Sequence, residues 1–94
     1  LDMGYVNMNG DTVPTTQMTD AMHRSMADYY NFIVRKYFEI IPPAQQYGIT
    51  QWCPTDAPGA LGTGWRGGEP VGLWDQNYNR KYAYAGFANG LMGK

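Results

Sequence analysis

The order of elements along the chain predicts an α/β fold that is incomplete by itself. Apolar residues recur at spacings of three and four over 20–41, which predicts a long amphipathic helix. A short β-branched and aromatic run at 47–53 predicts a buried strand, and 80–92 predicts a second helix. With a strand end at 1–3, the order is βαβα. Parallel sheets are buried on both faces, so two such strands cannot close a core of their own.

Length and composition narrow the classes of protein. The 94 residues suit one small domain, and a net charge of −1 without a basic stripe argues against a nucleic-acid partner. No apolar run approaches the roughly 20 residues that cross a membrane, and no signal peptide opens the chain. One cysteine and one histidine exclude a disulfide framework and a two-histidine metal cluster, and we expect no cofactor.

The first 19 residues are polar and rich in turn formers. The sequence Asn9-Gly10-Asp11 favours a tight turn because Asn and Gly tolerate positive φ angles. Residues 5–6 and 12–13 could pair across this turn as a hairpin, and a long ordered loop fits the short flanks equally well.

The predicted helix at 20–41 has clear end signals. Thr19 can accept from free backbone amides at the start, and Asp20 suits the positive end of the helix dipole. Pro42 and Pro43 are expected to end the helix or to kink it. Its apolar face is broad and requires a large partner surface; it comprises Met22, Met26, Tyr29, Tyr30, Ile33, Val34, Tyr37, Phe38 and Ile41.

A long loop rich in glycine and proline separates the second predicted strand from the last helix. It runs from about Pro54 to Pro70 and carries Trp65 and Arg66; loops of this length are usually functional or disordered. A short apolar stretch at 71–75 and a turn at 76–79 follow. The last helix is expected to present Ala83, Phe87 and Leu91 on one face.

Five stretches of the chain, in the right order, resemble the end of the catalytic barrel of glycoside hydrolase family 10, the endo-β-1,4-xylanases. They are LD at 1–2, GITQW at 48–52, TD at 55–56, WR at 65–66 and PVGLWDQNYNRKYAY at 70–84. The family has a strand ending in Thr-x-Trp, a Trp-Arg pair in the next loop, and an Asp-x-x-Tyr run that leads into the last helix. Arg80 stands where the family commonly has Pro, and the stretch between Trp52 and Trp65 is longer than usual.

The resemblance implies that residues 1–94 are about the last quarter, from the end of strand seven to helix eight, of a (β/α)8 TIM barrel. The complete barrel would be an endo-1,4-β-xylanase that hydrolyses internal β-1,4 bonds of xylan with retention of configuration. Retention requires two carboxyl groups, a nucleophile and an acid/base. The resemblance places the nucleophilic Glu immediately before Leu1 and the acid/base Glu on strand four, so neither lies in this chain.

Trp52, Trp65 and Arg66 are the predicted substrate-binding residues. An indole can cover the apolar face of a sugar, contributing about 1–2 kcal/mol at roughly 25 cal/mol per Å². A core role for Trp52, a loop anchor for Trp65 and a surface role for Arg66 are the alternatives. Asp2 and Asp56 follow predicted strands, and for both we favour orientation of neighbouring groups by hydrogen bonds over direct contact with substrate.

The other candidates have plainer interpretations. Asp75 is interpreted as the end of a short strand or as a turn acceptor, and Trp74 as a core residue. Cys53 has no second histidine as a base and is expected to be buried, and His23 is expected at the surface or between helices.

Two further hypotheses stay open. The chain could be a carbohydrate-binding module that stacks sugars on Trp and Tyr without catalysis, although such modules are usually all-β. It could also be a fragment that pairs with a separate chain supplying the N-terminal part of the barrel. The expected partners are xylan or xylo-oligosaccharides and that remaining part. By resemblance, the location is secreted, periplasmic or at the cell surface, since polymeric xylan cannot enter a cell intact.

Overall fold

A long helix, α1, forms the axis of the molecule in this computed structural model, which describes residues 1, 3–51, 53–57 and 68–94. α1 spans Asp20–Ile40. The Thr19 hydroxyl accepts from the amide of Met22 at 3.2 Å, so the predicted N-terminal cap is confirmed. At the other end the Gln46 side chain donates to the Ile41 carbonyl at 2.7 Å, just before the two prolines.

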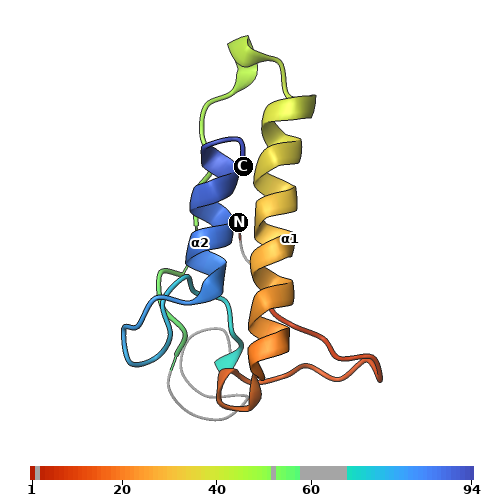
Figure 1. The fold of residues 1–94 in the computed structure, drawn as a ribbon, viewed down its shortest axis with the longest axis vertical. Coiled ribbons are helices and arrows are strands. Elements are labelled where there is room, and N and C mark those ends of the chain that lie inside the picture. Colours follow the sequence, from red (N-terminus) through yellow and green to blue (C-terminus); the bar gives the residue numbers. More distant parts are fainter. Residues whose placement is uncertain (2, 52, 58–67) are drawn as a thin grey trace.

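The second helix, α2, spans Tyr82–Leu91 and lies alongside α1 (Figure 1). It ends where Gly93 adopts a positive φ of 78°, which lets the amide of Lys94 donate to the Asn89 carbonyl at 2.7 Å. Both helices therefore lie within a few residues of their predicted positions. Two 3₁₀ turns, η1 at Thr15–Gln17 and η2 at Pro43–Gln45, flank α1.

Small residues bring the two helices into close contact. The stripe of α2 that α1 covers is Ala83, Gly86 and Gly90, all buried. A Cβ atom on Gly86 would lie 2.7 Å from the carbonyl carbon of Ala27, which is too close for real atoms. The predicted face of Ala83, Phe87 and Leu91 is therefore wrong in part, because close backbone approach selects glycine and leaves Leu91 51% exposed.

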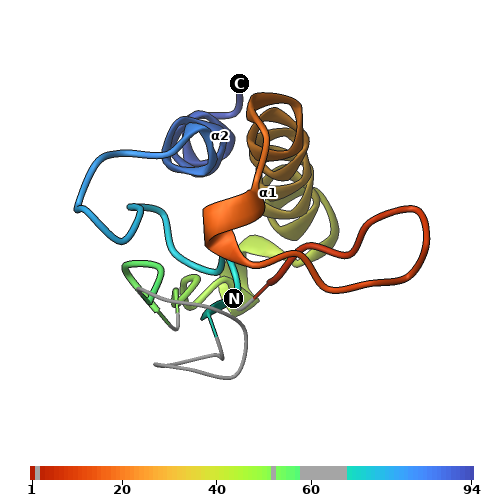
Figure 2. The ribbon, with the colours of Figure 1, turned by 90° about the horizontal axis from the view of Figure 1, so that it is seen from below.

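The segments without helix lie together on one side of the helix pair, as the end-on view in Figure 2 shows. Across the described part of the chain they carry isolated β-bridges rather than strands. The bridges are Val6–Thr12 (antiparallel), Thr55–Trp74 (parallel) and Trp74–Arg80 (antiparallel). The first of these shows that the N-terminal turn is a short hairpin, one of the two alternatives open for the sequence.

The strand predicted at 47–53 is not found in its described residues. Tyr47 is 92% exposed, and Gly48 has a positive φ of 128°, which interrupts an extended backbone. A strand also needs a neighbour for its backbone groups, and here Thr50 has one such contact, from the Leu1 nitrogen to its carbonyl. The α/β barrel segment stays a prediction.

The core lies between α1, the start of α2 and the segment around Leu73. Its buried members are Met26, Tyr30, Leu73 and Ala83. Partly buried residues pack around them, namely Leu1, Met3, Tyr5, Met18, Trp74, Tyr84 and Phe87. Trp74, expected in the core, thus lies at its margin, where its ring meets Tyr84 edge-on at 5.2 Å between centroids.

We predict that Gly86→Ala destabilises the fold despite the better helix propensity of alanine. That propensity would contribute about 1 kcal/mol, whereas overpacking costs about 1–3 kcal/mol and the colliding atoms belong to the backbone of Ala27. Urea unfolding followed by circular dichroism measures the difference. Ala85→Ser, at the exposed neighbouring position, is the control and should change stability by less than about 0.5 kcal/mol. Equal or greater stability of Gly86→Ala would contradict the close packing.

Candidate functional site

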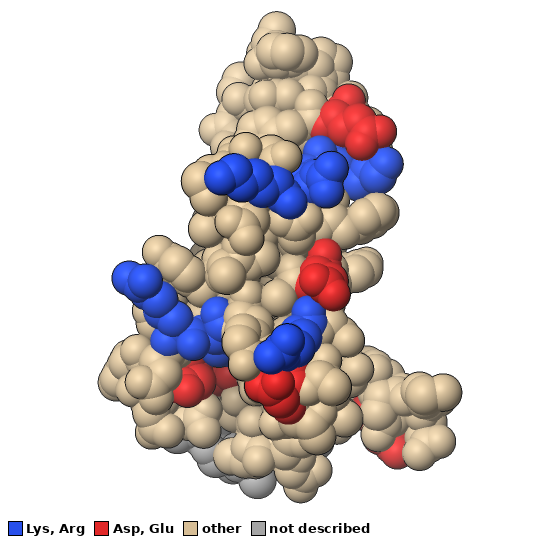
Figure 3. Space-filling view, viewed as in Figure 1, with Lys and Arg blue, Asp and Glu red and all other residues tan. Residues whose placement is uncertain are grey.

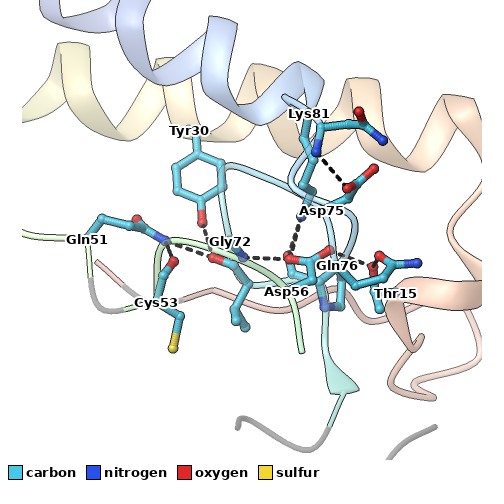
Figure 4. A network of polar contacts seen from close by, with 12 residues as sticks. Thr15, Tyr30, Gln51, Cys53, Asp56, Gly72, Asp75, Gln76 and Lys81 are labelled. Atoms are coloured by element: carbon cyan, nitrogen blue, oxygen red, sulfur yellow. Dashed lines mark hydrogen bonds and ion pairs between the residues drawn. The ribbon is translucent and has the colours of Figure 1, made fainter. Parts of the chain in front are cut away.

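Asp56 is the centre of a buried polar cluster formed by Thr15, Asp56, Pro70, Gly72 and Lys81, which we call the Asp56 cluster (Figure 4). The residue is 1% exposed. Its Oδ1 accepts from the Gly72 amide at 2.7 Å and from Lys81 Nζ at 3.0 Å, and its Oδ2 accepts from the Thr15 hydroxyl at 2.5 Å. Both carboxylate oxygens are therefore occupied by groups of the chain itself.

Lys81 supplies the positive charge of this cluster from the position just before α2. Its side chain is 3% exposed, and Nζ also donates to the Pro70 carbonyl at 3.1 Å. Burial lowers the pKa of Lys81 from its ordinary value, and the adjacent Asp56 carboxylate opposes that shift. An ammonium at a helix N-terminus also faces the positive end of the helix dipole. The Asp56 carboxylate therefore compensates both the cost of burying the Lys81 charge and its repulsion by the dipole.

The backbone of residues 70–72 is satisfied largely by side chains. Tyr30 donates its hydroxyl to the Val71 carbonyl at 3.2 Å, and Gln51 Nε2 donates to the same oxygen at 2.7 Å. Together with the contacts of Pro70 and Gly72, this arrangement holds a fully buried stretch without a sheet around it.

Of the predicted site residues, Asp56 lies in the described part of the chain. Its carboxylate is buried and hydrogen-bonded to three other segments of the chain. The orienting role that the sequence favoured for it stays a prediction. The other predicted site residues lie outside the described part of the chain: Asp2, Trp52, Trp65 and Arg66.

Two residues of the cluster, Thr15 and Lys81, were not singled out from the sequence. Thr15 lies in the turn before α1 and carries no motif. Lys81 did carry a signal, because a lysine at the N-terminal end of a largely apolar helix calls for a nearby acid. What the sequence lacks is the identity of that acid, 25 residues away.

Asp75 and Cys53 follow their plainer interpretations. Asp75 Oδ1 accepts from the amides of Asn77 at 2.8 Å and Asn79 at 2.9 Å, closing the turn in which Tyr78 has a positive φ of 66°. Burial opposes ionisation of this carboxyl, but those amide contacts outweigh it and hold its pKa below the ordinary value. Cys53 is buried at 7% exposure, as expected.

His23 lies half-buried on α1, beside a polar hollow. The side chains around this hollow include Asp20, Asp75 and Lys81. Its Nδ1 atom is buried, and no described group of the chain pairs with it. Burial lowers the pKa of His23 below its ordinary value, and the charge of Lys81 lowers it further.

Among the described residues, neither a metal-holding group of side chains nor a membrane-spanning helix is found. Nowhere in them do three His, Cys, Asp or Glu side chains gather into a group that could hold a metal ion. Neither of the two described helices is long and apolar enough to cross a bilayer.

An apolar groove opens beside α1, on the side of the N-terminal segment. It lies between residues 3–6 and the α1 residues Met26, Tyr29 and Ile33. Tyr29 is 56% exposed and Phe32, whose ring stacks on it at 6.3 Å between centroids, is 54% exposed. Charged groups on the face seen in Figure 3 lie in small clusters of both signs, separated by wide uncharged areas. Of the apolar face expected for α1, Tyr29 and Phe38 are exposed, whereas Met26, Tyr30 and Val34 are buried.

Comparison with known proteins links the chain to one kind of enzyme. It is similar to the endo-beta-1,4-xylanase Xyn10C of Cellvibrio japonicus, with 31% identity over 102 aligned residues. The alignment covers 99% of this chain and 17% of that xylanase. No protein-family model matches the chain, and no solved structure matches it. The chain therefore resembles a xylanase along its whole length while spanning a small part of that protein.

We predict that acid destabilises the fold through His23. The pKa of His23 is depressed in the folded state, so the unfolded chain binds more protons once the pH falls below about 6.5. Stability is therefore full above that pH and is lost as the pH falls toward the lower folded value. Urea unfolding at pH 7.5, 6.5 and 5.5 should show this loss.

The variant His23→Gln isolates the effect because the chain has one histidine. Its stability should vary less with pH over the same range. A steeper fall in the variant than in the parent, or a stability that rises on acidification, would show that His23 is not held in its neutral form.

Proposed function

We propose that this chain is the C-terminal segment of the catalytic barrel of a family-10 endo-1,4-β-xylanase. The observation that carries the proposal is the similarity to a xylanase over 99% of the chain. The complete protein would hydrolyse internal β-1,4 bonds of xylan with retention of configuration, and it would act outside the cytosol, where xylan is found. The two catalytic carboxyl groups that retention needs would come from the preceding part of the barrel.

The contact between Leu1 and Thr50 supports an α/β arrangement. The Leu1 nitrogen donates to the Thr50 carbonyl although the two residues are 49 positions apart and the whole of α1 lies between them. In a (β/α)8 barrel, consecutive parallel strands lie side by side and a helix on the outside connects them. The Leu1–Thr50 contact would fit neighbouring strands seven and eight, with α1 as helix seven and α2 as helix eight.

The exposed apolar side chains support a larger body around this chain. Tyr29 and Phe32 are more than half exposed, Ile40 is 68% exposed, and the groove beside residues 3–6 is open. Contiguous apolar surface of this kind is uncommon on soluble monomers and marks a surface that packs against something else. Neighbouring helices and strands of the barrel would cover it.

Substrate contact is assigned to Trp52, Trp65 and Arg66 by resemblance. The two indoles would cover sugar faces, and the guanidinium would donate to a sugar hydroxyl or to a carboxylate. Asp2 and Asp56 would orient neighbouring groups. For Asp56 the hydrogen bonds to Thr15, Gly72 and Lys81 give this role a physical basis.

A binding module without catalysis has less support. Modules that present Trp and Tyr platforms are usually all-β, whereas this chain packs α1 against α2 and has isolated bridges in the rest of its described residues. An assembly with a second chain that supplies the rest of the barrel has the same chemistry and differs in the number of chains.

The test begins with the coding sequence before Leu1. We expect a Glu codon immediately upstream, and we expect the protein extended by the full upstream sequence to release reducing sugar from xylan. Proton NMR of the first products should show the retained anomer. Conversion of that Glu to Gln should abolish hydrolysis. An extended, folded protein without xylanase activity would refute the proposal.

Within the active protein, Trp65→Ala should raise KM for xylo-oligosaccharides. Loss of about 1–2 kcal/mol of stacking corresponds to about a 5- to 30-fold rise. Trp74→Phe is the matched control, because the Trp74 ring packs on Tyr84 at the margin of the core, and it should leave KM unchanged. A normal KM for Trp65→Ala would remove Trp65 from the substrate site.

A further inference from the structure

We propose that Asp56 and Lys81 are a positioning pair, which fixes the two chain segments on either side of residues 58–67 and so sets how well the protein binds its polysaccharide. The substrate part of this inference rests on the proposed xylanase function. The positioning part rests on the described residues alone.

Several segments of the chain meet at the Asp56–Lys81 pair. Asp56 lies two positions before residue 58, and Pro70 and Gly72 lie three and five positions after residue 67. Thr15 comes from η1, ahead of α1, and Lys81 immediately precedes α2. Four segments far apart in the sequence therefore converge on one carboxylate and one ammonium, as the close-up in Figure 4 shows.

Backbone hydrogen bonds and close packing hold the two flanking segments together. The Asp56 amide donates to the Trp74 carbonyl at 3.0 Å, and Leu73 and Trp74 both donate to the Pro54 carbonyl. A Cβ on Gly72 would lie 2.6 Å from the Cα of Thr55, so the two backbones touch. The Asp56 side chain also accepts from the Gly72 amide, which adds a further link between the same two segments. Residues 54–56 and 72–74, on either side of residues 58–67, are thus fixed relative to each other.

Positioning of the flanking segments explains the Asp56–Lys81 pair better than a gain in the stability of the fold does. A fully buried ion pair is weak evidence for stability, because well-packed apolar residues of similar volume often stabilise a fold as well or better. The side chains of Asp56 and Lys81 are 0% and 3% exposed and make directional contacts with Thr15, Gly72 and Pro70. Apolar replacements can fill the same volume, but they cannot form these directional hydrogen bonds. The geometry of the two flanking segments matters because residues 58–67 include Trp65 and Arg66, which the resemblance assigns to substrate binding.

The experiment uses the full protein that contains this sequence, with the double variant Asp56→Leu/Lys81→Met. This pair removes both charges together and keeps apolar volume, so it avoids leaving one buried charge unpaired. We expect KM for xylohexaose to rise at least tenfold while kcat changes less than threefold. Hydrogen exchange of peptides from 54–57 and 68–73 should quicken at least tenfold, whereas the amides of α2 keep their rates.

Asp20→Asn/Arg24→Gln is the matched control, since it removes an exposed ion pair with an Nε–Oδ2 distance of 3.0 Å. Neither KM nor exchange should change in it. A folded Asp56→Leu/Lys81→Met protein with normal KM and normal exchange would overturn the proposal. Faster exchange with a normal KM would overturn the link to the substrate and retain a structural role alone.

Two outcomes need separate interpretation. If the parent protein has no activity on xylan, the proposed function fails, and hydrogen exchange still decides whether the pair positions these segments. If the double variant does not fold, Lys81→Arg replaces it. That variant keeps the charge but changes the geometry, so positioning predicts a raised KM, and a purely electrostatic role predicts the parent value.

Discussion

The carboxylate of Asp56 is the constraint on which the described structure depends. It is buried, and it links Thr15 ahead of α1, the Gly72 amide and the Lys81 ammonium ahead of α2. Because a charge in an apolar interior is costly unless every partner is in place, these contacts hold together as a set or not at all. The Asp56 cluster therefore attaches both helices to the non-helical segments that contain Asp56 and Gly72. In an α/β fold, the hydrogen bonds of a sheet would hold such segments together.

The helix pair adds a second constraint of a different kind. Ala83, Gly86 and Gly90 let α2 approach α1 so closely that a methyl group on Gly86 would meet the Ala27 backbone. This contact covers one narrow stripe of α1, centred on Tyr30 and Val34. Tyr29 and Phe38 of the same apolar face stay exposed, which suits a surface that packs against something else.

These features and the similarity to a xylanase support each other. A match that covers 99% of the chain and 17% of that xylanase goes together with exposed apolar side chains on α1, which suit a surface that packs against something else. The Asp56–Lys81 pair then has the proposed role of fixing the described segments on either side of residues 58–67, in which the resemblance assigns Trp65 to sugar binding.

The sequence by itself determined the features that depend on neighbours within about four residues. These are both helices, the Thr19 cap, the proline stop and the Asp75 turn, because backbone capping and helical periodicity are local. It did not determine the face of α2, the lack of a strand among the described residues of 47–53, or the pairing of Lys81 with Asp56. Tertiary structure decided these, since they depend on close backbone approach, on a neighbouring strand, and on contacts between residues 25 to 41 positions apart.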